Sequence, residues 1–122
     1  MQTTTALSDA LERYLDLTSK QMQITAGNIA NVDTPGYKTQ GFDFKEQFAR
    51  ELNSTEDLDE LGGPQLEITD VDGLVARPDG NNVSMDREGM QLAKTQLQFR
   101  FGVQLLKNEF SGVMNAIQAE TK

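Results

Sequence analysis

The most constraining feature of the sequence is a row of apolar residues in its last third. The steps along this row are 4, 3, 4, 3 and 4 residues, and its members are Phe99, Val103, Leu106, Phe110, Val113 and Ile117. This spacing places all the side chains on one face of an α-helix, as in the seam of a coiled coil. A second row runs beside it and consists of Met90, Ala93, Leu97, Phe101 and Leu105. The apolar face is therefore wider than one partner helix requires, and suits burial against several neighbours.

We expect this C-terminal helix to span residues 86–119, a length of about 50 Å at ~1.5 Å per residue. Ser84 or Asp86 can cap its first turn, and Asp86 and Glu88 complement the positive end of the helix dipole. A globular chain of 122 residues has little room for an isolated core helix of this length. The helix therefore projects from the molecule or packs along a partner of similar length.

A thinner stripe at the start of the chain predicts a second helix over residues 6–30. Its members recur at steps of three and four, and are Leu7, Leu11, Tyr14, Thr18, Met22, Thr25 and Ile29. Two of them are threonines, where a strong core helix has leucine. The stripe fits either an ordinary amphipathic core helix or a helix that meets other helices only after assembly. This helix is the natural partner of the C-terminal one.

The middle of the chain lacks helical periodicity. A turn at Thr34-Pro35-Gly36 ends the first helix, because proline presets the first central position and glycine accepts the positive φ of the second. Phe42, Phe44 and Phe48 form an aromatic cluster that fits a small satellite core better than a docking patch. Residues 53–64 have the composition of a solvated loop, and alternation at Leu66 and Ile68 predicts a small hairpin within 65–83.

These patterns define the expected fold. It is mainly α, with two long terminal helices pairing as a coiled coil and an irregular or small-β acidic segment between them. We divide the chain into residues 1–38, the N-terminal helix and turn, residues 39–84, the exposed acidic region, and residues 85–122, the C-terminal helix. Together they form one structural unit without an independent second domain.

The net charge of −8 is concentrated in the middle of the chain. Residues 32–84 carry twelve acids and four bases, whereas both ends are close to neutral and can associate without strong self-repulsion. No stripe of Lys and Arg exists for nucleic acid or an anionic membrane. Asp9, Glu12 and Asp16 fall where a Sec signal has an apolar stretch, so we expect export, if any, without a cleaved signal.

The residue inventory argues against catalysis. The chain has no histidine and no cysteine, which excludes histidine-based triads and His/Cys zinc sites. The spacing of acids around Asp57 and Asp70 does not fit a calcium loop, and no glycine pattern fits a phosphate loop. We therefore expect no enzymatic activity, no cofactor, no metal and no small-molecule substrate.

Two stretches resemble a known family. Residues 27–38, GNIANVDTPGYK, resemble the N-terminal motif of bacterial flagellar axial proteins, which comprise rod, hook and hook-associated subunits. The run from Asn82 to Glu88, and the apolar positions after it, look like the short flagellar basal-body rod proteins in particular. Residues 22–38 and 80–119 carry the resemblance, 57 of the 122 positions. The motif residues that we single out are Asn28, Asn31, Thr34, Pro35, Gly36 and Tyr37.

The resemblance implies a structural subunit of the proximal rod, the drive shaft for flagellum-dependent motility. It implies polymerisation through the terminal helices, with the row from Phe99 to Ile117 as the assembly face and with Asn28 and Asn31 bonding to backbone near the turn. The implied partners are other rod subunits, proteins at the junction of the membrane ring and export gate, and the flagellar type III export apparatus. The implied location is the rod in the periplasmic space. The alternatives are another rod subunit of the same axis or a soluble coiled-coil adaptor.

Overall fold

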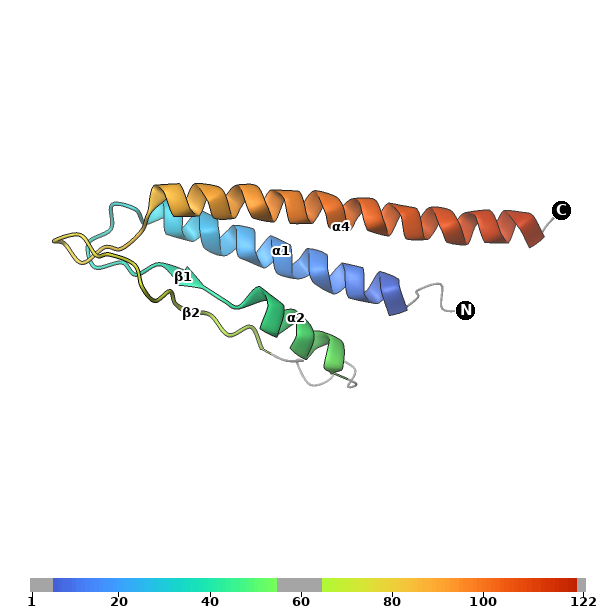
Figure 1. Ribbon diagram of the computed structural model, residues 1–122, viewed down its shortest axis with the longest axis horizontal. Helices are drawn as coiled ribbons and strands as arrows, with labels where there is room; N and C mark the ends of the chain where they lie inside the picture. Colours follow the sequence, from blue (N-terminus) through green and yellow to red (C-terminus); the bar gives the residue numbers. More distant parts are fainter. Residues whose placement is uncertain (1–5, 55–64, 121–122) are drawn as a thin grey trace.

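The computed structural model describes residues 6–54 and 65–120, and its frame is a pair of long antiparallel helices (Figure 1). The elements in chain order are α1 (Ala6–Ala30), β1 (Gln40–Gly41), α2 (Phe44–Asn53), β2 (Thr69–Asp70) and α4 (Met85–Glu120). Helix α1 lies along α4 for its whole length, and α4 continues beyond the first turn of α1 (Figure 1). The predicted fold class, mainly α with paired terminal helices and a small β element, is confirmed.

Helix α1 has the predicted bounds, and a proline–glycine turn ends the segment that follows it. The Asn31 amide still bonds to the Gly27 carbonyl oxygen at 3.1 Å, after which the chain leaves the helix. The Tyr37 amide then bonds to the Thr34 carbonyl oxygen at 3.2 Å, with Pro35 and Gly36 at the two central positions. Gly36 has φ +75°, which an L side chain rarely adopts. The predicted turn is confirmed.

Helix α4 extends one residue further at each end than predicted. Of the two proposed caps, Ser84 is the one used: its Oγ accepts from the Arg87 amide at 3.3 Å. Asp86 lies inside the first turn, where its charge favours the helix dipole. In the described part of the chain, no helix is long and apolar enough to cross a membrane.

The small sheet differs from the predicted hairpin within residues 65–83. Strand β2 pairs antiparallel with β1, so that Gln40 faces Asp70 and Gly41 faces Thr69. The predicted local hairpin is therefore wrong. A two-stranded hairpin is marginal in water by itself, whereas β1 is already held against α1 and offers β2 a fixed edge.

Helix α2 was not predicted. Asp43 caps it, since its Oδ1 accepts from the Glu46 amide at 3.0 Å, and the Asp43-x-x-Glu46 spacing is the capping-box signal that could have revealed it. Phe44 and Phe48 pack edge-on against Tyr14 of α1 with ring centroids 5.3 and 5.7 Å apart. The aromatic cluster is thus a satellite core, as predicted. Most of the predicted loop 53–64 lies outside the described residues, and the three-part division of the chain stays a prediction.

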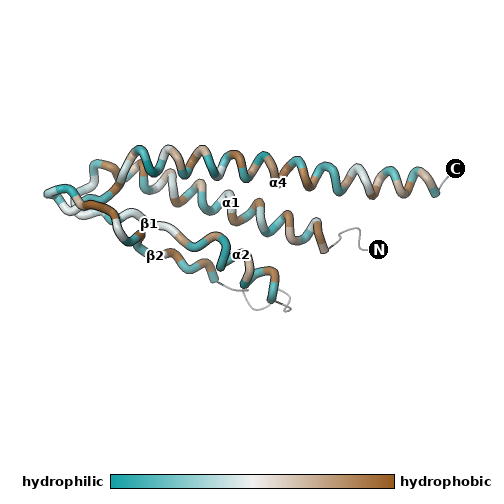
Figure 2. The backbone as a smooth tube through the Cα atoms, in the orientation of Figure 1, coloured by the Kyte–Doolittle hydropathy of each residue, from teal (hydrophilic) through white to brown (hydrophobic). Residues whose placement is uncertain are grey.

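The packing between the helices is mostly polar. Among the described residues the buried apolar side chains are Leu11, Leu17 and Val83, whereas ten polar or charged side chains are buried. Figure 2 shows hydrophobic and hydrophilic stretches alternating along all of α4, including the part beyond α1. A large share of the apolar surface of α4 is therefore not used to hold this chain together.

Candidate functional site

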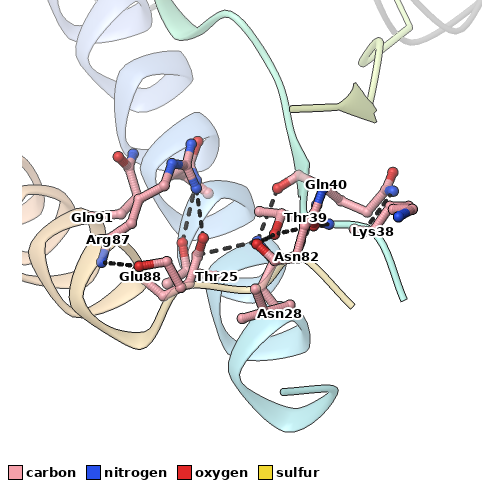
Figure 3. A network of polar contacts seen from close by, with 12 residues as sticks. Thr25, Asn28, Lys38, Thr39, Gln40, Asn82, Arg87, Glu88 and Gln91 are labelled. Carbon is pink, nitrogen blue, oxygen red and sulfur yellow. Dashed lines mark hydrogen bonds and ion pairs between the residues drawn. The ribbon is translucent and has the colours of Figure 1, made fainter. Parts of the chain in front are cut away.

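The first candidate region is the corner, which we define as residues 28–40 and 77–88, where α1 ends and α4 begins. Asn28 lies at its centre and is almost completely buried. Its Nδ2 donates to the Gln40 carbonyl oxygen at 2.9 Å and to Glu88 Oε2 at 3.1 Å. Its Oδ1 accepts from the Tyr37 hydroxyl at 3.1 Å and from the Gln40 amide at 3.0 Å. Figure 3 shows Asn28 beside Gln40. One side chain therefore joins both helices and β1.

Glu88 is a fully buried carboxylate in the first turn of α4. Arg87 Nη1 lies 2.5 Å from its Oε1, and Asn28 donates to its other oxygen. Figure 3 shows these groups at the junction of the two helices. A buried carboxylate is costly unless it is paired and hydrogen-bonded, and both conditions are met here. The charge thus fixes how the two helices meet at this end.

Asn81 and Asn82 form a second set of contacts that the sequence analysis did not single out. Asn81 is fully buried, and its Nδ2 donates to the carbonyl oxygens of Asn31 and Thr34 at 2.9 and 2.8 Å. Asn82 Oδ1 accepts from the amide and the hydroxyl of Thr39 at 2.7 and 2.9 Å. In the sequence, these contacts could have been suspected from two consecutive asparagines directly after the Pro78-Asp79-Gly80 turn. These contacts join the loop before α4 to the loop after α1.

The two loops touch at their glycines. Gly80 has φ +89°, and a Cβ there would lie 3.4 Å from the Gly36 Cα. The Gly36 amide also donates to the Asp79 carbonyl oxygen at 2.9 Å. The glycines therefore allow both the turn geometry and the close backbone approach.

The motif residues chosen from the sequence all lie in the corner. Asn28 bonds to backbone at Gln40, and Asn31 Nδ2 bonds to the Gly27 carbonyl oxygen at 2.7 Å. Thr34 Oγ1 donates to Asn31 Oδ1 at 3.0 Å. Of the six motif residues, all of which the structure describes, only Pro35 and Gly36 are exposed and make no side-chain hydrogen bond. The motif is thus used mainly inside the chain, to connect its segments.

The second candidate region is the contact line between α1 and α4, which we call the seam. All the buried residues of these two helices except two leucines are small or polar: they comprise Ser8, Leu11, Leu17, Thr18, Gln21, Thr25, Asn28, Glu88, Thr95 and Gly102. A Cβ on Gly102 would lie 2.8 Å from Leu15 Cδ2 and 3.1 Å from Tyr14 Cδ1. The hydroxyls of Thr18 and Thr95 bond to carbonyl oxygens of their own helices. Small side chains therefore let the two helices approach closely.

The predicted assembly face lies beside this seam. Val103, Leu106 and Val113 are half-buried, whereas Phe99, Phe110 and Ile117 are 36, 48 and 50% exposed. At 100° per residue, Leu106 is about 40° from Gly102 around the helix, and Phe101 is about 100° away on the other side. Phe101, Leu97 and Met90 are 61, 69 and 75% exposed. The terminal helices do pack together, but two apolar rows of α4 flank their contact line and stay open to solvent.

One titratable group among the described residues, Tyr14, has a clearly shifted pKa. Burial raises the pKa of the Tyr14 hydroxyl above its ordinary value, and a hydrogen bond with Gln98 opposes the shift. In residues 6–54 and 65–120, no group of three or more His, Cys, Asp or Glu side chains could hold a metal ion. The arrangement is that of a connecting and packing surface.

The known proteins that this chain resembles in sequence are flagellar basal body rod proteins. A family model described as flagella basal body rod protein matches residues 15–38, which span most of α1 and the turn after it. The flagellar basal body rod protein FlgB of Salmonella typhimurium is 34% identical over 125 residues, covering 88% of this chain and 89% of that protein. FlgB of Escherichia coli K12 is 28% identical, with 88 and 90% covered. FlgB of Cereibacter sphaeroides ATCC 17023 is 34% identical, with 87 and 89% covered.

Proposed function

This chain belongs to the FlgB family of flagellar basal body rod proteins, and we propose that it is a proximal rod subunit that polymerises through its terminal helices. The membership covers nearly the whole chain, including both long helices. A rod protein assembles with other rod subunits, so its function depends on surfaces that its own fold leaves uncovered.

The observation that carries the proposal is the exposed apolar surface of α4. Exposed side chains of this kind recur from Met90 to Ile117, over most of the helix. Soluble monomers rarely leave contiguous apolar surface of this extent open, and such surface marks interaction sites. Because the two rows face different directions around α4, each can pack against a different neighbour.

The mechanism that we propose combines a fixed corner with open helix faces. The bonds of Asn28, Glu88 and Asn81 fix the angle at which the chain turns between α1 and α4. The open rows then pack against helices of neighbouring subunits through unlike surfaces. Such heterologous contacts build an open helical filament where like surfaces would close a dimer.

We further propose that the role is structural and not enzymatic. The family name describes a rod component, and the chain offers neither histidine nor cysteine. The specific partners are part of the same proposal: they are neighbouring rod proteins and proteins at the junction of the membrane ring and the export gate. The export route is the flagellar type III apparatus, and the location is the rod in the periplasmic space. Family membership is the support for these partners and for this location.

The decisive experiment deletes the gene in its source bacterium and restores it on a plasmid. We expect the deletion strain to lack rod, hook and filament together in electron micrographs of basal bodies, and to be non-motile. Restoring the gene should return all three. Intact rods and normal swimming in the deletion strain would contradict the proposal. Cross-linking of neighbours in isolated basal bodies then separates a proximal position from another position along the same rod.

A further inference from the structure

A groove lies on the side of α1 between α4 and the start of α2. Its volume is about 520 Å³. The lining includes Gln21 of α1, Phe42 and Phe44 beside α2, and Gln91 and Gln98 of α4. In the described residues α2 contacts α1 and not α4, so the groove is open between them. It borders the corner, with which it shares Gln40 and Arg87, and its lining contains no residue of the predicted assembly face.

The charged side chains around this groove are not balanced. Lys45, Arg87 and Lys94 line it together with Asp43 and Asp70. Both acids are engaged locally, since Asp43 caps α2 and Asp70 accepts a bond from Gln40 Nε2. Arg87 is paired with Glu88, but its side chain stays about one-third exposed. The lining therefore holds three cations and two carboxylates, and two of the cations, Lys45 and Lys94, have no hydrogen bond or ion pair within the described structure.

The rest of the chain supplies an obvious counterpart. Between residues 51 and 76 the sequence contains eight acids and no base. The densest part consists of Glu56, Asp57, Asp59 and Glu60, with Leu58 among them. Two copies with a net charge of −8 repel each other at long range, so a filament of such copies needs local contacts of opposite charge.

We propose that this groove binds the acidic stretch 56–60 of a neighbouring copy in the rod, an inference that rests on the proposed function. The carboxylates face Lys45, Lys94 and the exposed part of Arg87, and Leu58 lies against Phe42 and Phe44. We assign the stretch to a neighbouring copy because a filament of acidic copies needs contacts of opposite charge between them, and the cross-linking experiment below separates this from binding of the chain's own stretch.

Photo-cross-linking tests where the stretch binds. A photo-reactive residue replaces Gln91, which lines the groove but carries no charge. Isotope-labelled and unlabelled copies are co-expressed in the deletion strain, and basal bodies are isolated and irradiated. Mass spectrometry should identify adducts between position 91 of one copy and residues 51–65 of a copy with the other label. Adducts only within one copy, adducts to a different protein, or no adduct would each overturn the proposal.

Charge exchange tests the chemistry of the contact. Lys45→Glu combined with Lys94→Glu should reduce the cross-link between copies roughly tenfold, because like charges then face each other. Adding Glu56→Lys and Glu60→Lys to the same chain should restore it to within about twofold of the original. The matched control is Arg100→Glu with Lys107→Glu, the same change of charge on α4 outside the groove, which should leave the yield unchanged. A control that lowers the yield equally, or an exchange that restores nothing, would count against the groove.

Failure of this inference is distinguishable from failure of the proposed function. If Lys45→Glu with Lys94→Glu leaves the cross-link and the rods intact while the gene deletion removes the rods, the groove proposal is wrong and the rod assignment stands. If the deletion strain builds normal rods, both are wrong.

Discussion

The corner and the far half of α4 use opposite kinds of surface. In the corner, polar side chains such as Asn28, Asn81 and Glu88 are buried and bonded within the chain. Along α4 from Leu97 to Ile117, apolar side chains are exposed, and α4 continues beyond α1 without a partner in the described structure (Figures 1 and 2). The corner is complete in a single chain, whereas we propose that the helix face is covered only in an assembly.

This difference shows how one short chain can have a defined shape and still polymerise. Buried polar networks are directional, and therefore fix geometry at the point where the chain turns. The hydrophobic effect is not directional: burying apolar surface lowers the free energy whichever chain covers it. The buried polar network in the corner thus sets the shape of the chain, whereas the apolar surface of α4 is available for association.

The largest expected effect is on the open face. Leu106→Asp or Phe110→Asp should abolish rod assembly and motility, because a carboxylate in a buried helix contact costs several kcal/mol. The measurement is basal-body electron microscopy of the complemented deletion strain. Gln104→Asp, an exposed polar position on the same helix, is the control and should leave rods intact. Full motility of the Leu106 and Phe110 variants would show that the open face of α4 is not needed for assembly, and the contrast with the corner would fail.

The next largest effect is in the corner. Asn28→Asp keeps the shape of the side chain but places a second carboxylate beside Glu88 and removes the Nδ2 donor. We expect a loss of about 3–5 kcal/mol in the free energy of unfolding, as when a buried charge loses its partner. Urea unfolding followed by circular dichroism measures it.

Two further variants sharpen that result. Asn108→Asp, on the exposed side of α4, should change stability by less than about 0.5 kcal/mol. Glu88→Gln in the Asn28→Asp background should recover part of the loss, because the amide can donate to the new carboxylate. Equal stability of the Asn28→Asp and Asn108→Asp variants would mean that the corner is not the fixed part of the chain.

Two of the three glycines in α4, Gly102 and Gly112, give a smaller and directly matched contrast. Gly102→Ala places a methyl group 2.8 Å from Leu15 Cδ2 and 3.1 Å from Tyr14 Cδ1, and this crowding should cost about 1–3 kcal/mol, of which the helix preference of alanine offsets roughly 0.5–1 kcal/mol. Gly112→Ala meets nothing within 4 Å and should stabilise α4 by roughly 0.5–1 kcal/mol, because alanine favours the helix. Urea midpoints of the two variants should therefore move in opposite directions. Shifts in the same direction would contradict the close approach of α1 and α4.

The smallest effect concerns Tyr14, at the satellite core. Burial raises the pKa of its hydroxyl in the folded chain above 10.0, while the hydrogen bond with Gln98 opposes this. Because the folded state holds the proton more tightly, the stability from this group is present below pH 10.0 and is lost as the pH rises through the raised pKa. NMR titration of labelled tyrosine should show Tyr14 titrating later when folded than in urea. An identical midpoint in both states would show that α2 leaves the ring in water.

Several parts of the fold were predictable because they depend on local spacing. Periodicity placed α1 and α4 to within one residue, and Pro35 with Gly36 predicted the turn. Helix α2 was missed because Phe44 and Phe48 were interpreted only as an aromatic cluster, although Phe44, Phe48 and Leu52 recur at steps of four and Asp43 marked the start. The hairpin was misplaced because the edge that β2 pairs with lies about thirty residues earlier in the chain. No local signal reports such a partner.

The sequence by itself determined where the long helices run, that their apolar surface exceeds what one partner can cover, and which family the motif around Asn28 to Tyr37 resembles. Only the tertiary structure decided which residues form the seam. Hydrophobic spacing favours the row from Phe99 to Ile117, but the α4 residues that the structure buries are Glu88, Thr95 and Gly102. The reason is physical: periodicity records which side chains must leave water, whereas steric fit and buried hydrogen bonds decide which contacts form within one chain.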